Sequence, residues 1–140
     1  MRVLFDTNVV LDVLENREPH VTDAAALFAA VDRSQVTGLL CATTVTTIHY
    51  IARQTLGPRK ARELLRKVLA MFAVVPVTHA IVVDALELDF PDYEDAVLHE
   101  AAVNAEAAAI VTRNAKDFRR SQVRVYTPAE LVAILQTVQP

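Results

Sequence analysis

Acidic and amide side chains recur in this sequence where short apolar segments end or where a helical pattern begins. They are Asp6, Asp92, Glu94, Asp95, Asn114 and Asp117. A carboxylate at the start of a helix can serve as an N-cap, because it accepts hydrogen bonds from the free amides of the first turn. The same carboxylate can also lie where open α/β sheets bind ligands, at the carboxyl end of a parallel strand. For Asp6, local sequence alone leaves both interpretations open.

Short apolar segments alternate with helical patterns along the whole chain, and this alternation predicts an α/β fold. We expect strands near residues 2–5, 39–43, 73–77, 108–112 and 123–126, with Gly38 in the turn before the second. Because such strands are apolar on both faces, the expected architecture is a three-layer sandwich. Its central sheet is mainly parallel, has four to five strands and is covered by helices on both faces. We expect residues 1–140 to form a single domain.

In a parallel sheet, the carboxyl ends of all strands meet at one edge, so three segments far apart in sequence deliver acids to one place. Two carboxylates about 4 Å apart repel each other by about 4 kcal/mol at an effective dielectric constant near 20. A cluster of three or four therefore needs protons or a cation. Oxygen ligands favour the hard ions Mg²⁺ or Mn²⁺ over zinc.

Other kinds of catalytic site lack support in the sequence. The four histidines, at positions 20, 49, 79 and 99, have no metal-ligand spacing, and the single cysteine, Cys41, lies in an apolar segment. The glycine-rich phosphate loops GxGxxG and GxxxxGK[ST] and the nucleophile motif GxSxG are absent. A metal site built from carboxylates therefore remains the chemistry that the residues favour.

Composition and charge limit the class of protein. The apolar fraction of 53% supports a well-filled core, and the net charge of −3 does not by itself indicate nucleic-acid binding. Basic residues are nevertheless concentrated in two segments, 53–67 and 113–124. Either segment could bind nucleic-acid phosphates, and either could be an ordinary solvated face. The second segment also flanks the acidic turn after residue 112. The sequence shows no signal peptide and no membrane span, so we expect a cytoplasmic protein.

Three motifs together resemble those of PIN domains. They are LFDTNVVLD at 4–12, EDAV at 94–97 and IVTRNAKDF at 110–118, and they occur in the family's order. PIN domains are metal-dependent ribonucleases that include the VapC toxins of toxin–antitoxin pairs. The resemblance extends over nearly the whole chain, and it implies Mg²⁺ or Mn²⁺ as cofactor and RNA as substrate.

The resemblance also implies roles for individual residues. The catalytic acids would be Asp6, Asp95 and Asp117, and the metal ligands would be Asp6, Glu94, Asp95, Asn114 and Asp117. Two side chains, Asn8 and Thr112, would orient the carboxylates. RNA would be contacted by Arg113, Lys116, Arg119 and Arg120.

This sequence departs from the family pattern at two positions. Thr47 occupies the place of an acidic residue that PIN domains usually carry on the helix after the second strand, and Asn114 stands where the last motif often has Asp. With one or two fewer negative charges, the site should bind a cation more weakly.

The resemblance further implies a homodimer and, if the chain is a toxin, a small antitoxin as partner. Two alternatives remain open. The chain could be a catalytically weak or inactive PIN-like module that binds RNA or a protein. It could also be a small phosphoryl-transfer domain with Asp6 as nucleophile, although Asn8 stands where such a domain would carry a second Asp.

Overall fold

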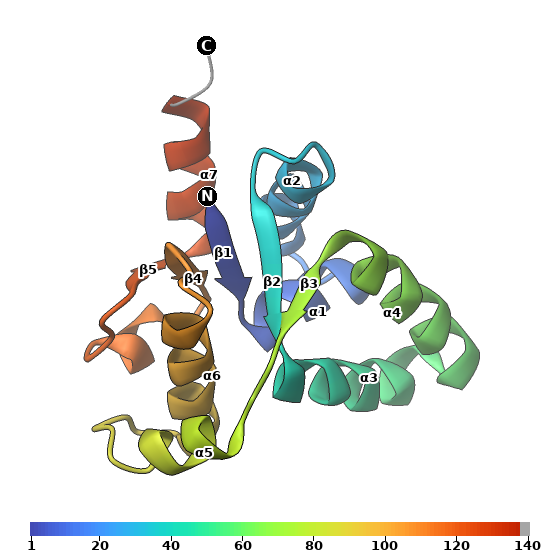
Figure 1. Ribbon diagram of the computed structural model, residues 1–140. Coiled ribbons are helices and arrows are strands. Elements are labelled where there is room, and N and C mark those ends of the chain that lie inside the picture. The colour runs from blue at the N-terminus through green and yellow to red at the C-terminus, as the bar shows by residue number, and fades with distance from the viewer. Residues whose placement is uncertain (138–140) are drawn as a thin grey trace.

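Five short strands form one sheet in the order β3-β2-β1-β4-β5, and every neighbouring pair is parallel (Figure 1). The computed structural model describes residues 1–137. The strands are β1 (Arg2–Phe5), β2 (Thr37–Cys41), β3 (Ala73–Val75), β4 (Ala109–Val111) and β5 (Arg124–Tyr126). The expected parallel sheet of four to five strands is thus confirmed.

Within residues 1–137, seven α-helices and one 3-10 turn connect and cover these strands. They are α1 (Thr7–Leu14), α2 (Val21–Asp32), α3 (Ala42–Leu56), α4 (Pro58–Met71), α5 (His79–Ala85), α6 (Tyr93–Asn104), η1 (Ala115–Phe118) and α7 (Pro128–Thr137). Over the same residues, none of the helices combines the length and the apolarity that crossing a bilayer needs.

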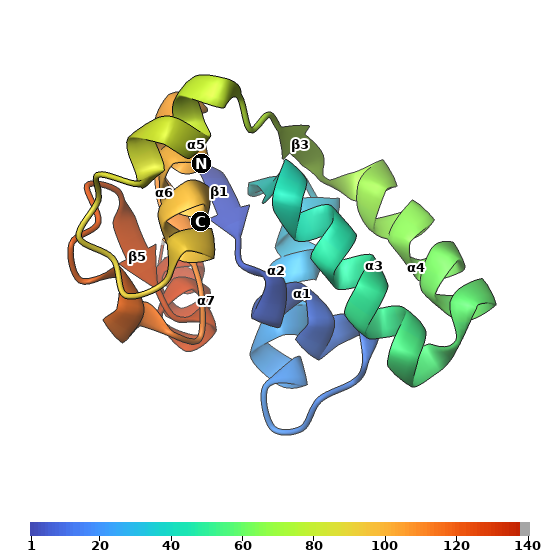
Figure 2. The same ribbon diagram turned by 90° about the horizontal axis from the view of Figure 1, so that it is seen from below.

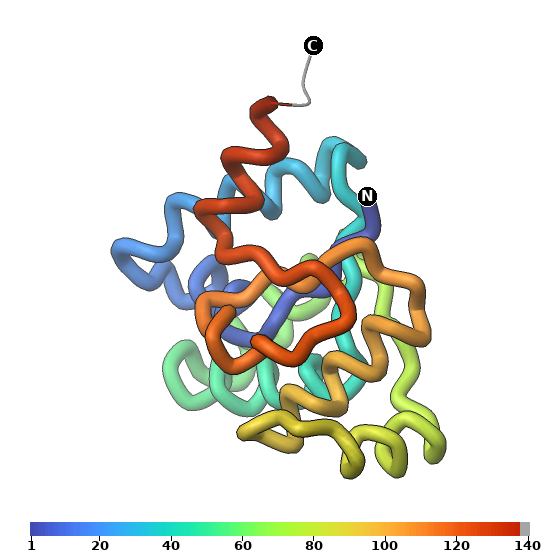
Figure 3. Tube along the Cα trace, turned by 90° about the vertical axis from the view of Figure 1, so that its left-hand side faces the viewer, coloured from blue at the N-terminus to red at the C-terminus, as the bar shows by residue number. Residues whose placement is uncertain are grey.

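Side chains that alternate along the strands form two cores, one on each face of the sheet. Val3 and Phe5 of β1 pack with helices α1, α2, α3, α4 and α7, whereas Leu4 packs with α6. Figure 2 shows α6 on one side of β1 and α1 and α3 on the other. Helices α2 and α7 lie against each other over the first face (Figure 3). The expected three-layer arrangement is confirmed.

Gly38 lies inside β2 and not in the turn that we predicted. A Cβ atom at this position would lie 2.6 Å from the ring of Phe72, which also packs edge-on against Phe5 with 5.0 Å between ring centroids. The glycine is therefore required by a close approach of an aromatic ring to the strand, which local sequence does not reveal. The second strand also ends two residues earlier than predicted, because α3 begins at Ala42.

Candidate active site

Asp6 follows the last residue of β1 and is 8% exposed. One carboxylate oxygen accepts a hydrogen bond from the backbone amide of Thr7 at 2.8 Å, so Asp6 caps α1. The other oxygen accepts from the hydroxyl of Thr112 at 2.8 Å and from the side-chain amide of Asn8 at 3.5 Å. The capping interpretation is therefore confirmed, and the same carboxylate also lies at the carboxyl edge of the central strand.

Thr112 links Asp6 to the turn that follows β4. Its side chain is fully buried, and its oxygen accepts from the backbone amide of Asn114 at 3.0 Å while donating to Asp6. Asn8 connects the same two segments, because its side-chain oxygen accepts from the backbone amide of Arg113 at 3.3 Å. Both side chains thus contact the carboxylate that we expect them to orient.

Helix α6 brings further acids to this edge. Asp92 caps the helix by accepting from the backbone amide of Asp95 at 3.0 Å, Glu94 is exposed and Asp95 is partly buried. Burial, followed by the charges of Asp6, Asp92, Asp117 and Glu94, raises the pKa of Asp95 from 3.8 to about 7. Carboxylates from three segments of the chain therefore act on one side chain, as the sequence predicted for a parallel sheet.

The same burial and the same neighbouring carboxylates also raise the pKa values of Asp6 and Glu94. Burial raises the pKa of Asp6 above its ordinary value, and hydrogen bonds from Thr112 and Thr7 oppose the rise. The charge of Asp92 adds to that rise. Loss of surrounding water, then the charges of Asp92 and Asp6, also raises the pKa of Glu94. Perturbed carboxylates that gather in one place are typical of functional sites.

The third acidic segment is the 3-10 turn η1 after β4. Asn114 is exposed and precedes the turn, and its carbonyl accepts from the backbone amide of Asp117 at 2.9 Å. Asp117 is partly buried, and its charge contributes to the raised pKa of Asp95. Asp92, which we expected at this edge but to which the resemblance gave no role, acts on Asp6, Glu94 and Asp95. Its place at the start of α6 beside two other acids was the available signal.

A family model described as PIN domain matches residues 2–116. The chain belongs to the PIN-domain family. The resemblance that its three motifs carry is thus confirmed. No curated protein sequence matches the chain significantly.

Solved structures show the same PIN fold at low sequence identity. VapBC2 from Rickettsia felis, bound to a DNA fragment from its promoter, aligns with a TM-score of 0.69 and 14% identity over 91% of this chain and 98% of that chain. A toxin–antitoxin complex from Klebsiella pneumoniae aligns with a TM-score of 0.68 and 22% identity over 90% of this chain and 97% of that chain. VapC20 from Mycobacterium tuberculosis is described as a Sarcin–Ricin loop cleaving toxin. It aligns with a TM-score of 0.63 and 12% identity over 77% of this chain and 86% of that chain.

The donor set of this PIN domain consists of oxygen atoms, which suits a hard divalent cation. The repulsion between the carboxylates around Asp95 favours binding of such an ion. As the side chains are placed, however, no group of three or more His, Cys, Asp or Glu residues within 1–137 lies close enough to hold one ion. The residues therefore fit a cation by chemistry and charge, and binding requires the carboxylates to move closer together.

Thr47 points its hydroxyl back into its own helix, where the hydroxyl donates to the carbonyl of Thr43 at 3.3 Å. Thr47 is partly buried on α3. A threonine that bonds to the preceding turn in this way supplies no negative charge at the position where the resemblance would place an acid. This contact agrees with the lower charge that the sequence indicated.

Arg113 has a partner that the sequence did not identify. Its guanidinium donates to both carboxylate oxygens of Asp12, from Nε at 2.7 Å and from Nη2 at 3.2 Å. Asp12 is fully buried on α1, and Nη1 of Arg17 lies 3.8 Å from it. A charged residue inside the apolar pattern of α1 was the signal for such a pair. The pair ties α1 to the turn that carries Asn114.

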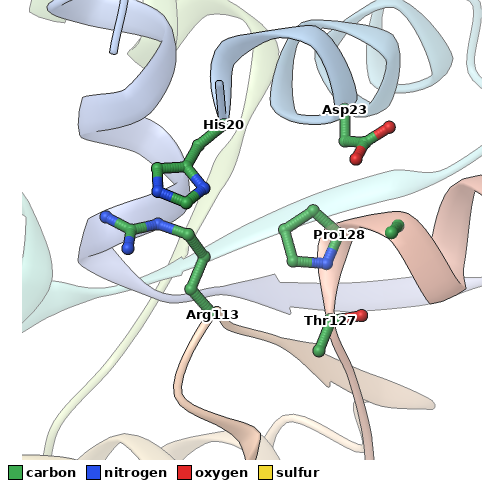
Figure 4. A pocket seen from close by; sticks show the side chains of 6 residues that line it. His20, Asp23, Arg113, Thr127 and Pro128 are labelled. Atoms are coloured by element: carbon green, nitrogen blue, oxygen red, sulfur yellow. The ribbon is translucent and has the colours of Figure 1, made fainter. Parts of the chain in front are cut away.

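Arg113 also lines a pocket of about 280 Å³ between the starts of α2 and α7. Figure 4 shows His20 and Arg113 turned toward each other on one side, with Asp23 and Pro128 opposite. The other predicted RNA-contacting residues, Lys116, Arg119 and Arg120, are exposed on η1 and on the segment after it. The four cations therefore lie on two sides of the turn, and their contact with RNA stays a prediction.

Proposed function

We propose that this PIN domain is a ribonuclease that hydrolyses RNA phosphodiester bonds with Mg²⁺ or Mn²⁺. The observation that carries the proposal is the raised pKa of Asp95, to about 7, caused by burial and by carboxylates from the end of β1, the start of α6 and η1. A divalent cation would relieve this repulsion and would place positive charge where a phosphate could bind. Membership of the PIN family supports this use of the acids.

Each polar residue of the site has a role in this proposal. Asp6, Asp95 and Asp117 would hold the cation and thus make the reaction possible, and Glu94 and Asn114 would complete the set of ligands. Thr112 and Asn8 hold the carboxylate of Asp6 in place through the bonds described above. When bound, the ion would activate water and offset the negative charge that develops on the phosphate. The Arg113–Asp12 pair would keep the turn after β4 in register with α1.

The fold relatives support a more specific assignment. VapC20 is described as a toxin that cleaves the Sarcin–Ricin loop, the structure from Klebsiella pneumoniae is described as a toxin–antitoxin complex, and the structure from Rickettsia felis contains VapBC2. We therefore propose that this chain is the toxin of a VapBC-type pair, that it forms a homodimer and that a small antitoxin binds it. A cytoplasmic location would follow from such a role.

RNA would be contacted through its phosphates by Arg113, Lys116, Arg119 and Arg120. Replacing the three exposed cations on and after η1 with alanine should weaken RNA binding and reduce its dependence on salt, since each phosphate contact contributes to that dependence. An unchanged salt dependence would count against this assignment.

Removal of the central carboxylate tests the proposed activity. We expect Asp6→Asn, which keeps a side chain able to cap α1, to lower the rate of Mn²⁺-dependent RNA cleavage by about a hundredfold or more, because metal-assisted charge stabilisation is worth several kcal/mol. Asp84→Asn, at an exposed position on α5, is the matched control and should cleave like wild type. Cleavage by Asp6→Asn at the wild-type rate would refute the nuclease.

A second candidate function is a PIN-like module that binds RNA or a protein without cleaving. Three observations favour it: Thr47 and Asn114 are uncharged, and no three His, Cys, Asp or Glu residues within 1–137 lie close enough for one ion. Wild-type protein that retains RNA intact in the presence of Mn²⁺, without binding the ion, would select this alternative.

A further inference from the structure

A cavity of about 200 Å³ opens directly beside the acidic site. One wall is the segment 89–91 between α5 and α6, and the other is formed by η1 and the residues that follow it, Lys116, Asp117, Arg119 and Arg120. Asp117 belongs to this wall and also to the cluster of acids, since its charge acts on Asp95. The cavity and the acidic site are therefore neighbours that share a residue.

Phe90 forms a fixed aromatic surface in this cavity. Phe90 is a partly buried residue whose ring packs edge-on against the buried ring of Phe118, with 5.8 Å between centroids. The same ring lies tilted against the ring of buried His99, with 5.0 Å between centroids. His99 also fixes the segment that continues from the opposite wall, because its Nε2 accepts from the backbone amide of Gln122 at 3.0 Å. Both walls are thus attached to α6, so a planar ligand could stack on Phe90 with little ordering of the protein.

The cationic wall supplies charge at the mouth of the cavity. Lys116 and Arg119 are exposed, and neither forms an ion pair with any residue in 1–137. Arg120 lies 3.7 Å from Asp89, and both of these side chains are largely exposed, so their pairing is weak. Two free cations therefore lie beside the aromatic ring and near the carboxylates.

Resting on the proposed function, we infer that this cavity binds one nucleotide of single-stranded RNA next to the cleaved phosphate. The base stacks on Phe90, and the adjoining phosphate is bound by Lys116 and Arg119. Sites for single strands combine an aromatic stacking surface with a cationic track in this way. The cavity is smaller than the roughly 300–1,000 Å³ of pockets for drug-sized ligands, so it suits one base of a longer chain. A base held there must be unpaired, which restricts the substrate to single-stranded segments and loops.

The test measures binding without cleavage. Asp95→Asn protein in EDTA, which we expect not to cleave, is titrated by fluorescence anisotropy with a labelled mixed-sequence oligoribonucleotide. A second probe has the same sugar–phosphate backbone but abasic residues throughout. Phe90→Leu, Phe90→Tyr and Arg119→Ala are each made in this background, and thermal unfolding confirms that each variant is folded.

We expect Phe90→Leu to weaken binding of the normal RNA by about fivefold or more, since stacking contributes about 1–3 kcal/mol per base, and to leave binding of the abasic probe unchanged. Phe90→Tyr keeps a ring and should restore the affinity. Arg119→Ala should weaken both probes and lower the salt slope by about one. Arg33→Ala, at an exposed position between α2 and β2 and thus at the amino edge of the sheet, is the matched control and should change neither.

Equal effects of Phe90→Leu on both probes, or no effect on either, would overturn the proposed subsite. A separate cleavage assay of wild type with Mn²⁺ tests the nuclease itself. If wild type cleaves RNA but Phe90→Leu binds both probes normally, the subsite fails and the proposed function stands. If wild type neither binds the ion nor cleaves, the proposed function fails, and the two probes still decide whether the cavity binds a base.

Discussion

Neutralising Asp95 should make the protein more stable when no metal is bound. The ionised form of this side chain is disfavoured in the folded state by burial and by four neighbouring carboxylates, which raise its pKa from 3.8 to about 7. Because the folded pKa lies above the unfolded one, ionisation opposes folding. This effect grows as the pH rises from about 4 and is complete above about pH 7.

The size of the effect follows from the same two pKa values. A difference of about three pKa units corresponds to about 4 kcal/mol at 1.36 kcal/mol per unit. Asp95 is only partly buried, so water screens the repulsion, and we expect Asp95→Asn to raise the free energy of unfolding at pH 8 by about 1–2 kcal/mol. For a chain of this length, that gain corresponds to an increase in Tm of about 3–7 °C.

Thermal and urea unfolding in EDTA at pH 8 and pH 5 tests this prediction. At pH 5 the gain should be smaller than at pH 8, because part of the ionisation cost of Asp95 is lost as the pH falls towards 3.8. Asp84→Asn removes an exposed charge elsewhere and should change stability by less than about 0.5 kcal/mol at either pH. A gain for Asp95→Asn that is absent at pH 8, or equal at both pH values, would refute the reasoning.

Two further predictions concern the scaffold. Arg113→Met should lower the free energy of unfolding by about 3 kcal/mol, because it leaves the fully buried carboxylate of Asp12 without its main partner. Asp12→Asn should lower this free energy less. Urea unfolding compares the two variants, and equal losses of stability would contradict the assigned pair. Gly38→Ala should lower the free energy of unfolding by about 1–3 kcal/mol, since the alanine Cβ would lie 2.6 Å from the ring of Phe72. A variant as stable as wild type in urea unfolding would show that the ring can move aside.

Local patterns were sufficient for the order of the elements and for the parallel sheet. Short β-branched and apolar segments predict where strands and helices alternate, and the breaker pair Gly57-Pro58 lies where α3 ends and α4 begins. Strand ends were less predictable, because they depend on which residue begins the following helix. The position of Gly38 depended on a ring more than thirty residues away, which no local pattern contains.

The site was predictable as far as strand topology determines it. Parallel strands bring Asp6 and Asp117 to the same edge, and the helix cap at Asp92 brings Asp95 there. The partner of Arg113 was not predictable from spacing, because Asp12 is a hundred residues away in sequence and is buried inside a helix. How closely the carboxylates approach one another also depends on side-chain rotation, which sequence patterns do not specify.

Titration calorimetry with Mn²⁺ on wild type and Asp95→Asn, with RNA cleavage followed in the same samples, tests the central claim most directly. We expect wild type to bind the ion and to cleave RNA, and Asp95→Asn to bind at least about tenfold more weakly and to lose cleavage, because a ligand charge is removed from an all-oxygen site. Equal binding and cleavage by the two proteins, or wild type that retains RNA without binding Mn²⁺, would contradict a metal-dependent nuclease at this edge of the sheet.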